Sequence, residues 1–158
     1  VRIFTNNDKD KTDILVEIFV PQAKFPDFIY LAREIMRTQA DSLLNVTIRE
    51  ISQDRDTALP YAKKDMFGLV MLFTIDRTEE AEKALLPSVS GLIDLALAQG
   101  GTFYLPYRNY ANTKQLLQAY PELENFISSK KKADPKEIFA SDFYSYFLQS
   151  ADWKNVIP

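Results

Sequence analysis

The chain has 158 residues, a length that suits one compact domain with an added tail. Hydrophobic residues make up 46% of it and aromatic residues 13%, which excludes a disordered chain, and a net charge of -3 argues against nucleic acid as a partner. Because cysteine and histidine are both missing, disulfides, thiolate nucleophiles and histidine-based metal sites or general bases are excluded.

The apolar runs are too short for a membrane helix. The longest, Phe67 to Phe73, is far below the roughly 20 residues that a membrane span needs, and no charged-then-apolar leader precedes it. We therefore expect a soluble, cytoplasmic protein with no membrane span. Because the chain begins at Val1 rather than at Met, we also expect that another segment precedes it in the native gene product.

Hydrophobic periodicity divides the first half of the chain into a strand, a helix and two strands. Alternation predicts a strand over residues 13–20, which Pro21 ends. Apolar residues three and four apart predict an amphipathic helix over residues 26–40. A second alternating strand covers residues 43–51, and residues 66–75 are apolar on both sides, as expected of a central strand.

Capping residues mark the elements that follow. Thr78 is suited to cap a helix, and Pro87 either kinks that helix or begins a second one. Gly100-Gly101 is a helix stop signal, and a short fourth strand is predicted over residues 102–106.

The order strand, helix, strand, strand, helix, strand is the split βαβ arrangement of ferredoxin-like domains. We therefore predict an α+β fold, an antiparallel sheet with its helices on one face, and the first and third strands in the centre. The open face can be a solvated surface or a ligand-facing one. The strand phases place on it Glu17, Phe19, Asn45, Thr47, Arg49 and Tyr104.

The residues after the sheet predict a helical extension, so we divide the chain into a ferredoxin-like domain over 1–110 and a helical extension over 111–158. Asn112 can cap a short helix that Tyr120-Pro121 breaks, and a second helix ends at Lys130 to Lys132. The three lysines fit a solvated helix end or an anion site. A final aromatic cluster could pack on the sheet or on a missing partner domain: Phe139, Phe143, Tyr144, Tyr146, Phe147 and Trp153.

Motifs for self-contained chemistry are few. No glycine-rich phosphate loop is present, and no serine sits in a nucleophile-elbow pattern. Asp54 and Asp56 flank Arg55 in a predicted turn over residues 52–60, where they favour turn chemistry over a metal site. We expect no metal site, no dinucleotide binding within these residues and no freestanding hydrolase.

Three parts of the sequence resemble a known family: Ile14 to Pro21, Asn45 to Arg49 with Tyr61-Ala62, and Gly100 to Phe139. Together they are similar to the C-terminal substrate (cap) domain of FAD-linked oxidases of the vanillyl-alcohol-oxidase-like superfamily, with cytokinin dehydrogenase and the sugar-lactone and alditol oxidases as the nearest groups. The resemblance covers nearly the whole chain. It implies that an N-terminal domain absent from this chain binds most of the FAD, and that the sheet lies over the flavin ring to form the substrate cavity.

The resemblance also implies roles for individual residues. Arg49 matches an arginine that faces the substrate in the alditol-oxidase-like members, which carry a glutamate where this chain has Thr47. Tyr104 and Tyr107 resemble positions that line the cavity, and Ser141 a position near the flavin. Many relatives have Lys-x-x-Tyr-Asp-Pro followed by Phe-x-Asn. This chain departs from both patterns, with Lys130-x-x-Ala133-Asp134-Pro135 and Phe139-Ala140-Ser141.

These observations lead to the hypothesis of a substrate-binding domain of an FAD-dependent oxidoreductase, inactive by itself, whose parent oxidises a CH-OH or CH-NH group by hydride transfer to flavin. Arg49 and Asn45 would position a small-molecule substrate, Glu17 would accept a proton, and Tyr104 and Tyr107 would line the cavity. Two alternatives remain open. One is a freestanding ferredoxin-like module that binds a small molecule or a protein without catalysis, and the other is a relative that kept the fold and lost catalysis.

Overall fold

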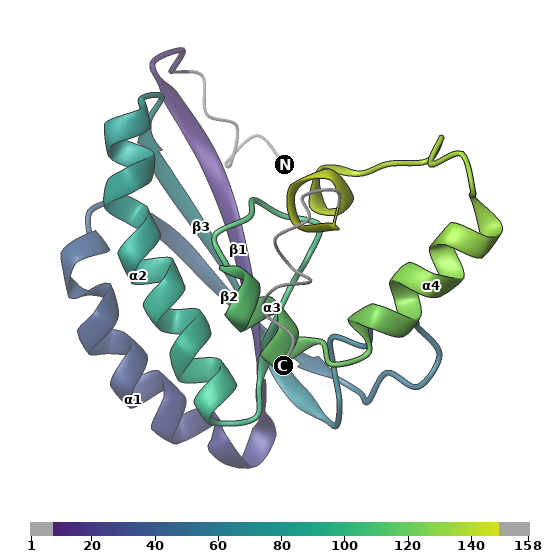
Figure 1. Cartoon of the computed structure of the whole chain (residues 1–158). Helices are drawn as coiled ribbons and strands as arrows, with labels where there is room; N and C mark the ends of the chain where they lie inside the picture. The colour runs from purple at the N-terminus through teal and green to yellow at the C-terminus, as the bar shows by residue number, and fades with distance from the viewer. Residues whose placement is uncertain (1–7, 149–158) are drawn as a thin grey trace.

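A computed structural model describes residues 8–148 of the chain. Its centre is a four-stranded antiparallel sheet in the order β2-β3-β1-β4, with helices packed against one face (Figure 1). The elements of this unit are β1 (Lys11–Pro21), α1 (Phe25–Ile35), β2 (Leu43–Ile51), β3 (Met66–Asp76), α2 (Glu79–Ala98) and β4 (Thr102–Phe103). The α+β prediction with central first and third strands is confirmed.

Three element boundaries differ from the sequence prediction. The first helix ends at Ile35, and the rest of its predicted length is the 3₁₀ turn η3 (Met36–Gln39). Pro87 lies inside one continuous α2 rather than at the start of a new helix. The fourth strand is only two residues long, because the chain leaves the sheet after the Tyr104 amide donates to the Glu17 carbonyl oxygen at 3.0 Å.

The face under the helices holds the main core. Every second residue of the two central strands points into it, and both sets are buried against Phe28 of α1 and Leu92 of α2. Full burial of such an apolar side chain stabilises the fold by about 1.5–3 kcal/mol. The strand residues of this set are Ile14, Val16, Ile18 and Val20 of β1 and Leu69, Met71, Phe73 and Ile75 of β3.

Glycines join α2 to the sheet. Gly100 has a φ of 77°, in the left-handed region that ends many helices. At Gly101 an added Cβ would lie 2.3 Å from the Phe19 carbonyl oxygen and 2.9 Å from that of Ala96. The predicted Gly-Gly stop is therefore confirmed, and the second glycine lets the helix end pack directly on β1.

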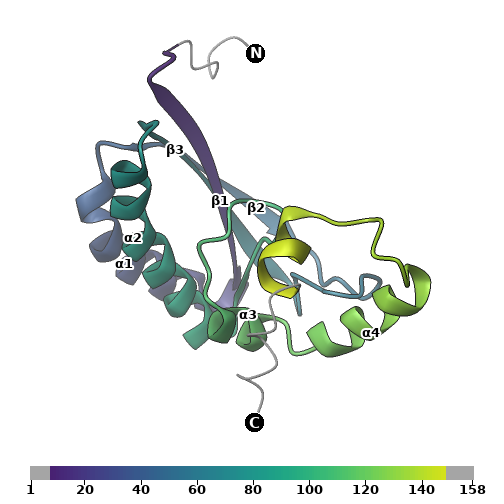
Figure 2. The same ribbon diagram turned by 45° about the horizontal axis from the view of Figure 1, so that its top comes forward.

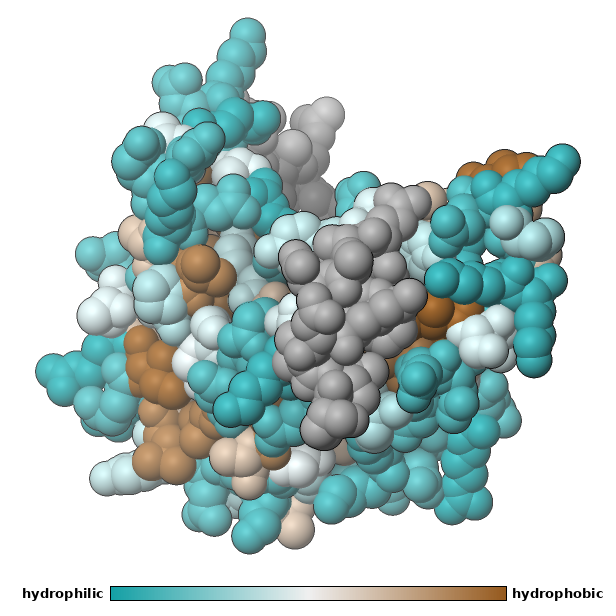
Figure 3. All heavy atoms as spheres, in the orientation of Figure 1, coloured by the Kyte–Doolittle hydropathy of each residue, from teal (hydrophilic) through white to brown (hydrophobic). Residues whose placement is uncertain are grey.

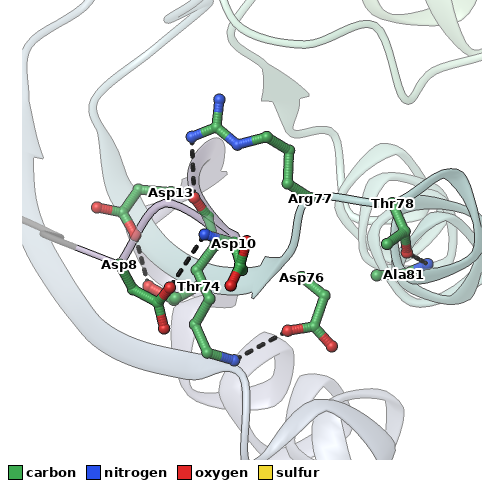
Figure 4. Close-up of polar contacts among 9 residues, drawn as sticks. Asp8, Asp10, Asp13, Thr74, Asp76, Arg77, Thr78 and Ala81 are labelled. Carbon is green, nitrogen blue, oxygen red and sulfur yellow. Dashed lines mark hydrogen bonds and ion pairs between the residues drawn. The ribbon is translucent and has the colours of Figure 1, made fainter.

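Polar contacts join β1 and β3 at the end of the pair where β1 begins and β3 ends, as Figure 4 shows. Lys11 Nζ lies 3.0 Å from Asp76 Oδ1, and the Thr74 hydroxyl donates to Asp13 Oδ1 at 2.5 Å. The Thr78 hydroxyl oxygen accepts from the Ala81 amide at 3.2 Å, which confirms Thr78 as the N-cap of α2.

The C-terminal helices lie beyond the β4 edge of the sheet (Figures 1 and 2), as α3 (Thr113–Ala119), α4 (Leu123–Ala133) and the π-helical turn η4 (Tyr144–Leu148). Asn112 and Gln115 form a capping box at the start of α3, as predicted. The Tyr120 hydroxyl donates to the Phe103 carbonyl oxygen and ties this extension to β4. One hydrophobic cluster runs without a break from the sheet to α4, so the extension packs on the ferredoxin-like unit.

The predicted aromatic cluster is only partly buried. Tyr144 and Phe147 are buried, whereas Phe139 is 79% and Tyr146 59% exposed, and Trp153 lies outside the described residues. Figure 3 shows patches of hydrophobic residues over α1 and α2 on an otherwise largely hydrophilic side, with Ile29, Leu31 and Leu86 among the exposed apolar side chains. Within residues 8–148, no helix has both the length and the hydrophobicity for a membrane crossing.

Candidate functional site

The open face of the sheet gathers the polar side chains that alternate with the core residues. Across β1, β3 and β2, Glu17 pairs with Val70, which in turn pairs with Thr47. In the next row, Phe19 and Arg49 both pair with Gly68. Since paired residues lie on the same face of a sheet, the predicted placement of Glu17, Phe19, Thr47 and Arg49 together is confirmed.

Glu17 is the unusual member of this face, because its side chain is buried and charged. The residue is only 8% exposed, and no side chain or amide among residues 8–148 donates a hydrogen bond to its carboxylate. Burial raises the pKa of the Glu17 carboxyl, and the nearby positive charge of Arg49 lowers it. The Glu17 oxygens are not among the fully buried side-chain atoms that lack a partner within residues 8–148, so they reach solvent and can accept a hydrogen bond from a ligand there.

Aromatic rings form a wall beside this carboxylate. The ring centroids of Phe19 and Tyr61 are 4.7 Å apart, and those of Tyr61 and Tyr104 are 5.8 Å apart. Tyr104 also meets Tyr107 at 5.2 Å, edge to face. The wall therefore consists of four rings: Phe19 of β1, Tyr61 of the loop between β2 and β3, and Tyr104 and Tyr107 after β4.

The electrostatics confirm that these groups are neighbours. Burial is the main cause that raises the pKa of the Tyr107 hydroxyl. The charges of Glu17 and Tyr104 raise this pKa further, and Arg49 lowers it. Tyr107 therefore lies near Glu17, Tyr104 and Arg49, and Glu17 lies near Arg49, which places a carboxylate, a guanidinium and two phenols on the open face.

Tyr61 belongs to this wall although the sequence prediction of site residues did not include it. The Thr102 hydroxyl donates to the Tyr61 carbonyl oxygen, which holds the loop between β2 and β3 against β4. The Tyr61-Ala62 pair was one of the segments that carried the family resemblance, and that was the signal from which the residue could have been found.

The other two predicted site residues lie farther from Glu17. Asn45 pairs with Leu72 one row beyond Thr47, is exposed, and donates to the Thr47 hydroxyl oxygen at 3.1 Å. Ser141 lies at the start of the C-terminal turn, where its hydroxyl oxygen accepts from the Tyr144 amide at 3.2 Å. The structure thus brings together four of the six predicted residues and places Asn45 and Ser141 at the periphery.

Ser141 and Tyr107 both line a hollow of about 860 Å³, which lies between the first half of β1 and the C-terminal turn. Side chains around it include Asp13, Leu15, Tyr107, Ser141, Phe143 and Tyr146. This volume lies within the range of about 300–1,000 Å³ that is usual for ligand pockets.

The described residues offer space for a flat ring system, and Gly100-Gly101 offers no site for the phosphates of a dinucleotide. The hollow beside Tyr107 and Ser141 has room for a planar ring system next to the aromatic wall. In contrast, Gly100-Gly101 does not form a phosphate cradle, because carbonyl oxygens of Phe19 and Ala96 crowd Gly101 where a phosphate would need amide donors. Any FAD held here would need most of its contacts from another domain.

Two other charged segments are explained by structure alone. The Asp54 carboxylate accepts from the amides of Asp56 and Thr57, both at 3.1 Å, and so caps a turn. Lys130 Nζ lies 2.6 Å from Asp134 Oδ2 and 4.6 Å from the centre of the Tyr144 ring. Within residues 8–148, no three acidic side chains converge in a way that could hold a metal ion.

No family model matches this sequence, and neither does any curated protein. The functional assignment therefore depends on the geometry of the open face and on the resemblance of the quoted segments. Chemically, the open face offers a buried proton acceptor, a cation and two phenols beside a hollow large enough for a small molecule.

Proposed function

We propose that this chain is the substrate-binding C-terminal domain of an FAD-dependent oxidoreductase. The observation that carries the proposal is the buried, unpartnered carboxylate of Glu17 beside Arg49, Tyr104 and Tyr107 on a sheet face that the helices do not cover. The family resemblance implies that the cofactor is FAD and that the partner is an N-terminal FAD-binding domain of the same parent chain. By itself, the chain would be inactive.

Glu17 is suited to accept a proton from the substrate hydroxyl or amine. Its burial raises the carboxyl pKa, which makes the carboxylate a stronger base than an exposed one, and the group has no protein donor to compete with a substrate. Oxidation of a CH-OH group to a carbonyl releases one hydride and one proton. In the proposed reaction Glu17 takes the proton, and FAD, when bound, supplies the hydride acceptor.

Arg49 and the tyrosines would orient the substrate and stabilise charge. Arg49 is exposed on β2, with β3 between it and the Glu17 strand, and we propose that its guanidinium reaches a substrate oxygen or the negative charge that develops on the reduced ring. Tyr104 and Tyr107 would line the substrate cavity, and Asn45, one row of the sheet beyond Thr47, would help to position the substrate. Ser141, across the hollow from β1, is a candidate cofactor contact.

The first experiment is the intact mass of the native gene product that contains this chain, recorded together with its visible absorption spectrum. The proposal expects a product several hundred residues long with the absorption bands of a flavin. A colourless product of about the present length would contradict it and favour the freestanding binding module.

A further inference from the structure

The two edges of the sheet differ. At the β4 edge, the C-terminal extension packs against a strand of only two residues, and the Tyr120 hydroxyl donates to the Phe103 carbonyl oxygen there. At the other edge, no strand of the described part of the chain lies beyond β2, and residues 44–50 of this strand are all exposed. The sheet therefore ends in a long strand with one side free.

The backbone groups that face this free edge follow from the pairing of the strands. The Tyr104 amide donates to the Glu17 carbonyl oxygen, so Glu17 directs its backbone polar groups towards β4. Its partner on β3, Val70, then bonds to Thr47 on β2, because these directions alternate between neighbouring residues and neighbouring strands. The β2 residues whose N–H and C=O groups point away from the sheet are therefore Val46, Ile48 and Glu50.

Apolar side chains accompany these free backbone groups. Val46 is 40% and Ile48 52% exposed, although they pair with Met71 and Leu69 of the helix-covered core. Neither lysine nor proline occurs in β2, although proteins commonly use both to keep an edge strand from pairing. The edge therefore offers hydrogen bonds and apolar surface to another strand, which is the combination that strand addition uses.

The side chains of β2 are arranged symmetrically about Thr47. Positions at equal distances on either side of it match in kind: Val46 with Ile48, Asn45 with Arg49, and Leu43 with Ile51. When two copies of this strand pair antiparallel and are centred on Thr47, apolar side chains lie opposite apolar ones, and no like charges lie opposite each other. A pair centred on Ile48 would instead place Val46 opposite Glu50.

We infer that the β2 edge binds a second copy of this chain, strand to strand and antiparallel, about a twofold axis through Thr47. Val46 of each copy exchanges backbone hydrogen bonds with Ile48 of the other, and the two sheets join into one with the helices on the same face. Asn45 of the second copy then lies opposite Arg49 on the open face. The inference concerns an interaction surface and does not depend on the proposed function.

Disulfide cross-linking in the native gene product tests the register. At a non-hydrogen-bonded pair, the two Cα atoms of a Thr47→Cys variant should lie about 4.5 Å apart, within the range of about 4.4–6.8 Å that a disulfide spans. Under mild oxidation we expect linked pairs, identified after trypsin digestion as the peptide of residues 38–49 joined to itself. Since this chain has no cysteine of its own, only the introduced one can give that product.

A single cysteine elsewhere on the same strand is the matched control. Asn45→Cys should not link to itself, because in the proposed register the two copies of this position are offset by roughly 14 Å along the strands. A mixture of the Asn45→Cys and Arg49→Cys variants should link, since these two positions lie opposite each other.

Sedimentation velocity measures the strength of the association. We expect a pair of chains with a Kd below about 100 µM, and Ile48→Lys should weaken it at least about tenfold, because the change places a charge against Val46 of the other copy. Leu86→Lys, at an apolar residue of α2 that is 42% exposed, is the control and should leave the association unchanged. Circular dichroism of each variant verifies its fold.

Three results would overturn the inference. A native gene product that stays monomeric at about 100 µM would mean that the β2 edge is left unpaired or is covered by another segment of the parent chain. A pair that does not link through Thr47→Cys, or that a folded Ile48→Lys variant leaves intact, would place the contact elsewhere. The absorption spectrum of the same sample bears on the proposed function alone, so the two tests fail separately.

Discussion

The face of the sheet under α1 and α2 and the face opposite use the same strands for different purposes. Under the helices, alternate residues such as Ile18 and Leu69 are apolar and buried, so burial there contributes stability. On the open face, Glu17 is largely buried, and the exposed residues near it include the polar Thr47 and Arg49 as well as the apolar Leu15. The difference teaches that a strand can build a core with one set of residues while the other set carries polar and charged groups that add little to stability.

A pair of leucines on β3 gives the largest expected contrast between the faces. Leu69 is 3% exposed in the helix-covered core, and Leu69→Ala should lower the free energy of unfolding by about 2–5 kcal/mol. Leu72 is half-buried on the open face, and Leu72→Ala should lower the free energy of unfolding by less than about 2 kcal/mol. Urea unfolding of both variants measures the difference. Equal losses would show that the open face is covered to the same extent as the core.

Arg49→Ala probes the open face by activity rather than by stability. In the flavin-loaded native gene product, the change should lower kcat/KM at least about tenfold. This corresponds to a loss of about 1.4 kcal/mol of transition-state stabilisation. Arg33→Ala, at an exposed position on α1, is the matched control and should leave the kinetics unchanged. Steady-state kinetics that do not respond to loss of the Arg49 side chain would remove that residue from the site.

Tyr120→Phe tests how the C-terminal extension is joined to β4, at the edge of the sheet. The change deletes the hydroxyl that donates to the Phe103 carbonyl oxygen and should cost about 1 kcal/mol of stability. Tyr30→Phe, at a residue that is 75% exposed, should cost nothing measurable. Thermal unfolding compares the two variants, and a loss no larger than that of the control would mean that the bond does not hold β4 in place.

Glu17→Gln should change stability least of these variants, and unlike the others it should raise the free energy of unfolding. Because burial raises the carboxyl pKa, Glu17 favours the fold fully below its unfolded value of 4.5, and this contribution is lost as pH rises through the raised folded pKa. A glutamine keeps the shape without the charge, so we expect the variant to be more stable at pH 7, by less than about 1 kcal/mol. The two proteins should be equally stable at pH 3.

Urea unfolding at both pH values checks this sign. Glu50→Gln, at an exposed position of β2 on the opposite face of the sheet, is the control and should leave the pH dependence as it was. A Glu17→Gln variant that is less stable than the parent at pH 7 would mean that Arg49 stabilises the carboxylate by more than burial destabilises it.

Periodicity predicted the fold well because the signals are local. Alternation located β1 and β2, a run apolar on both sides located β3, capping residues located α2 and α3, and the split βαβ order gave the sheet topology. The length of β4 was not predictable from its own residues. The Thr102 to Pro106 segment has strand composition, and only the departure of the chain after the Tyr104 bond to Glu17 shortens the strand.

The candidate site was predictable where it follows strand phase and not where it depends on distant segments. Alternation put Glu17 and Arg49 on one face, and the structure agrees. The burial of Glu17 and the place of Tyr61 in the aromatic wall depend on how the loop before β3 and the segment after β4 pack together. No pattern within either segment contains that information.

The pairing of β1 with β3 has a consequence for the order of folding. Its register joins Pro21 to Met66 at one end and Lys11 to Asp76 at the other, so the partners come from distant parts of the chain. A long loop that contains α1 and β2 must close before these bonds form, and its closure entropy makes this a slow step compared with helix formation. The surface that holds Glu17 opposite Val70 therefore exists only after this late closure, and a chain still emerging from the ribosome cannot form it until β3 has been made.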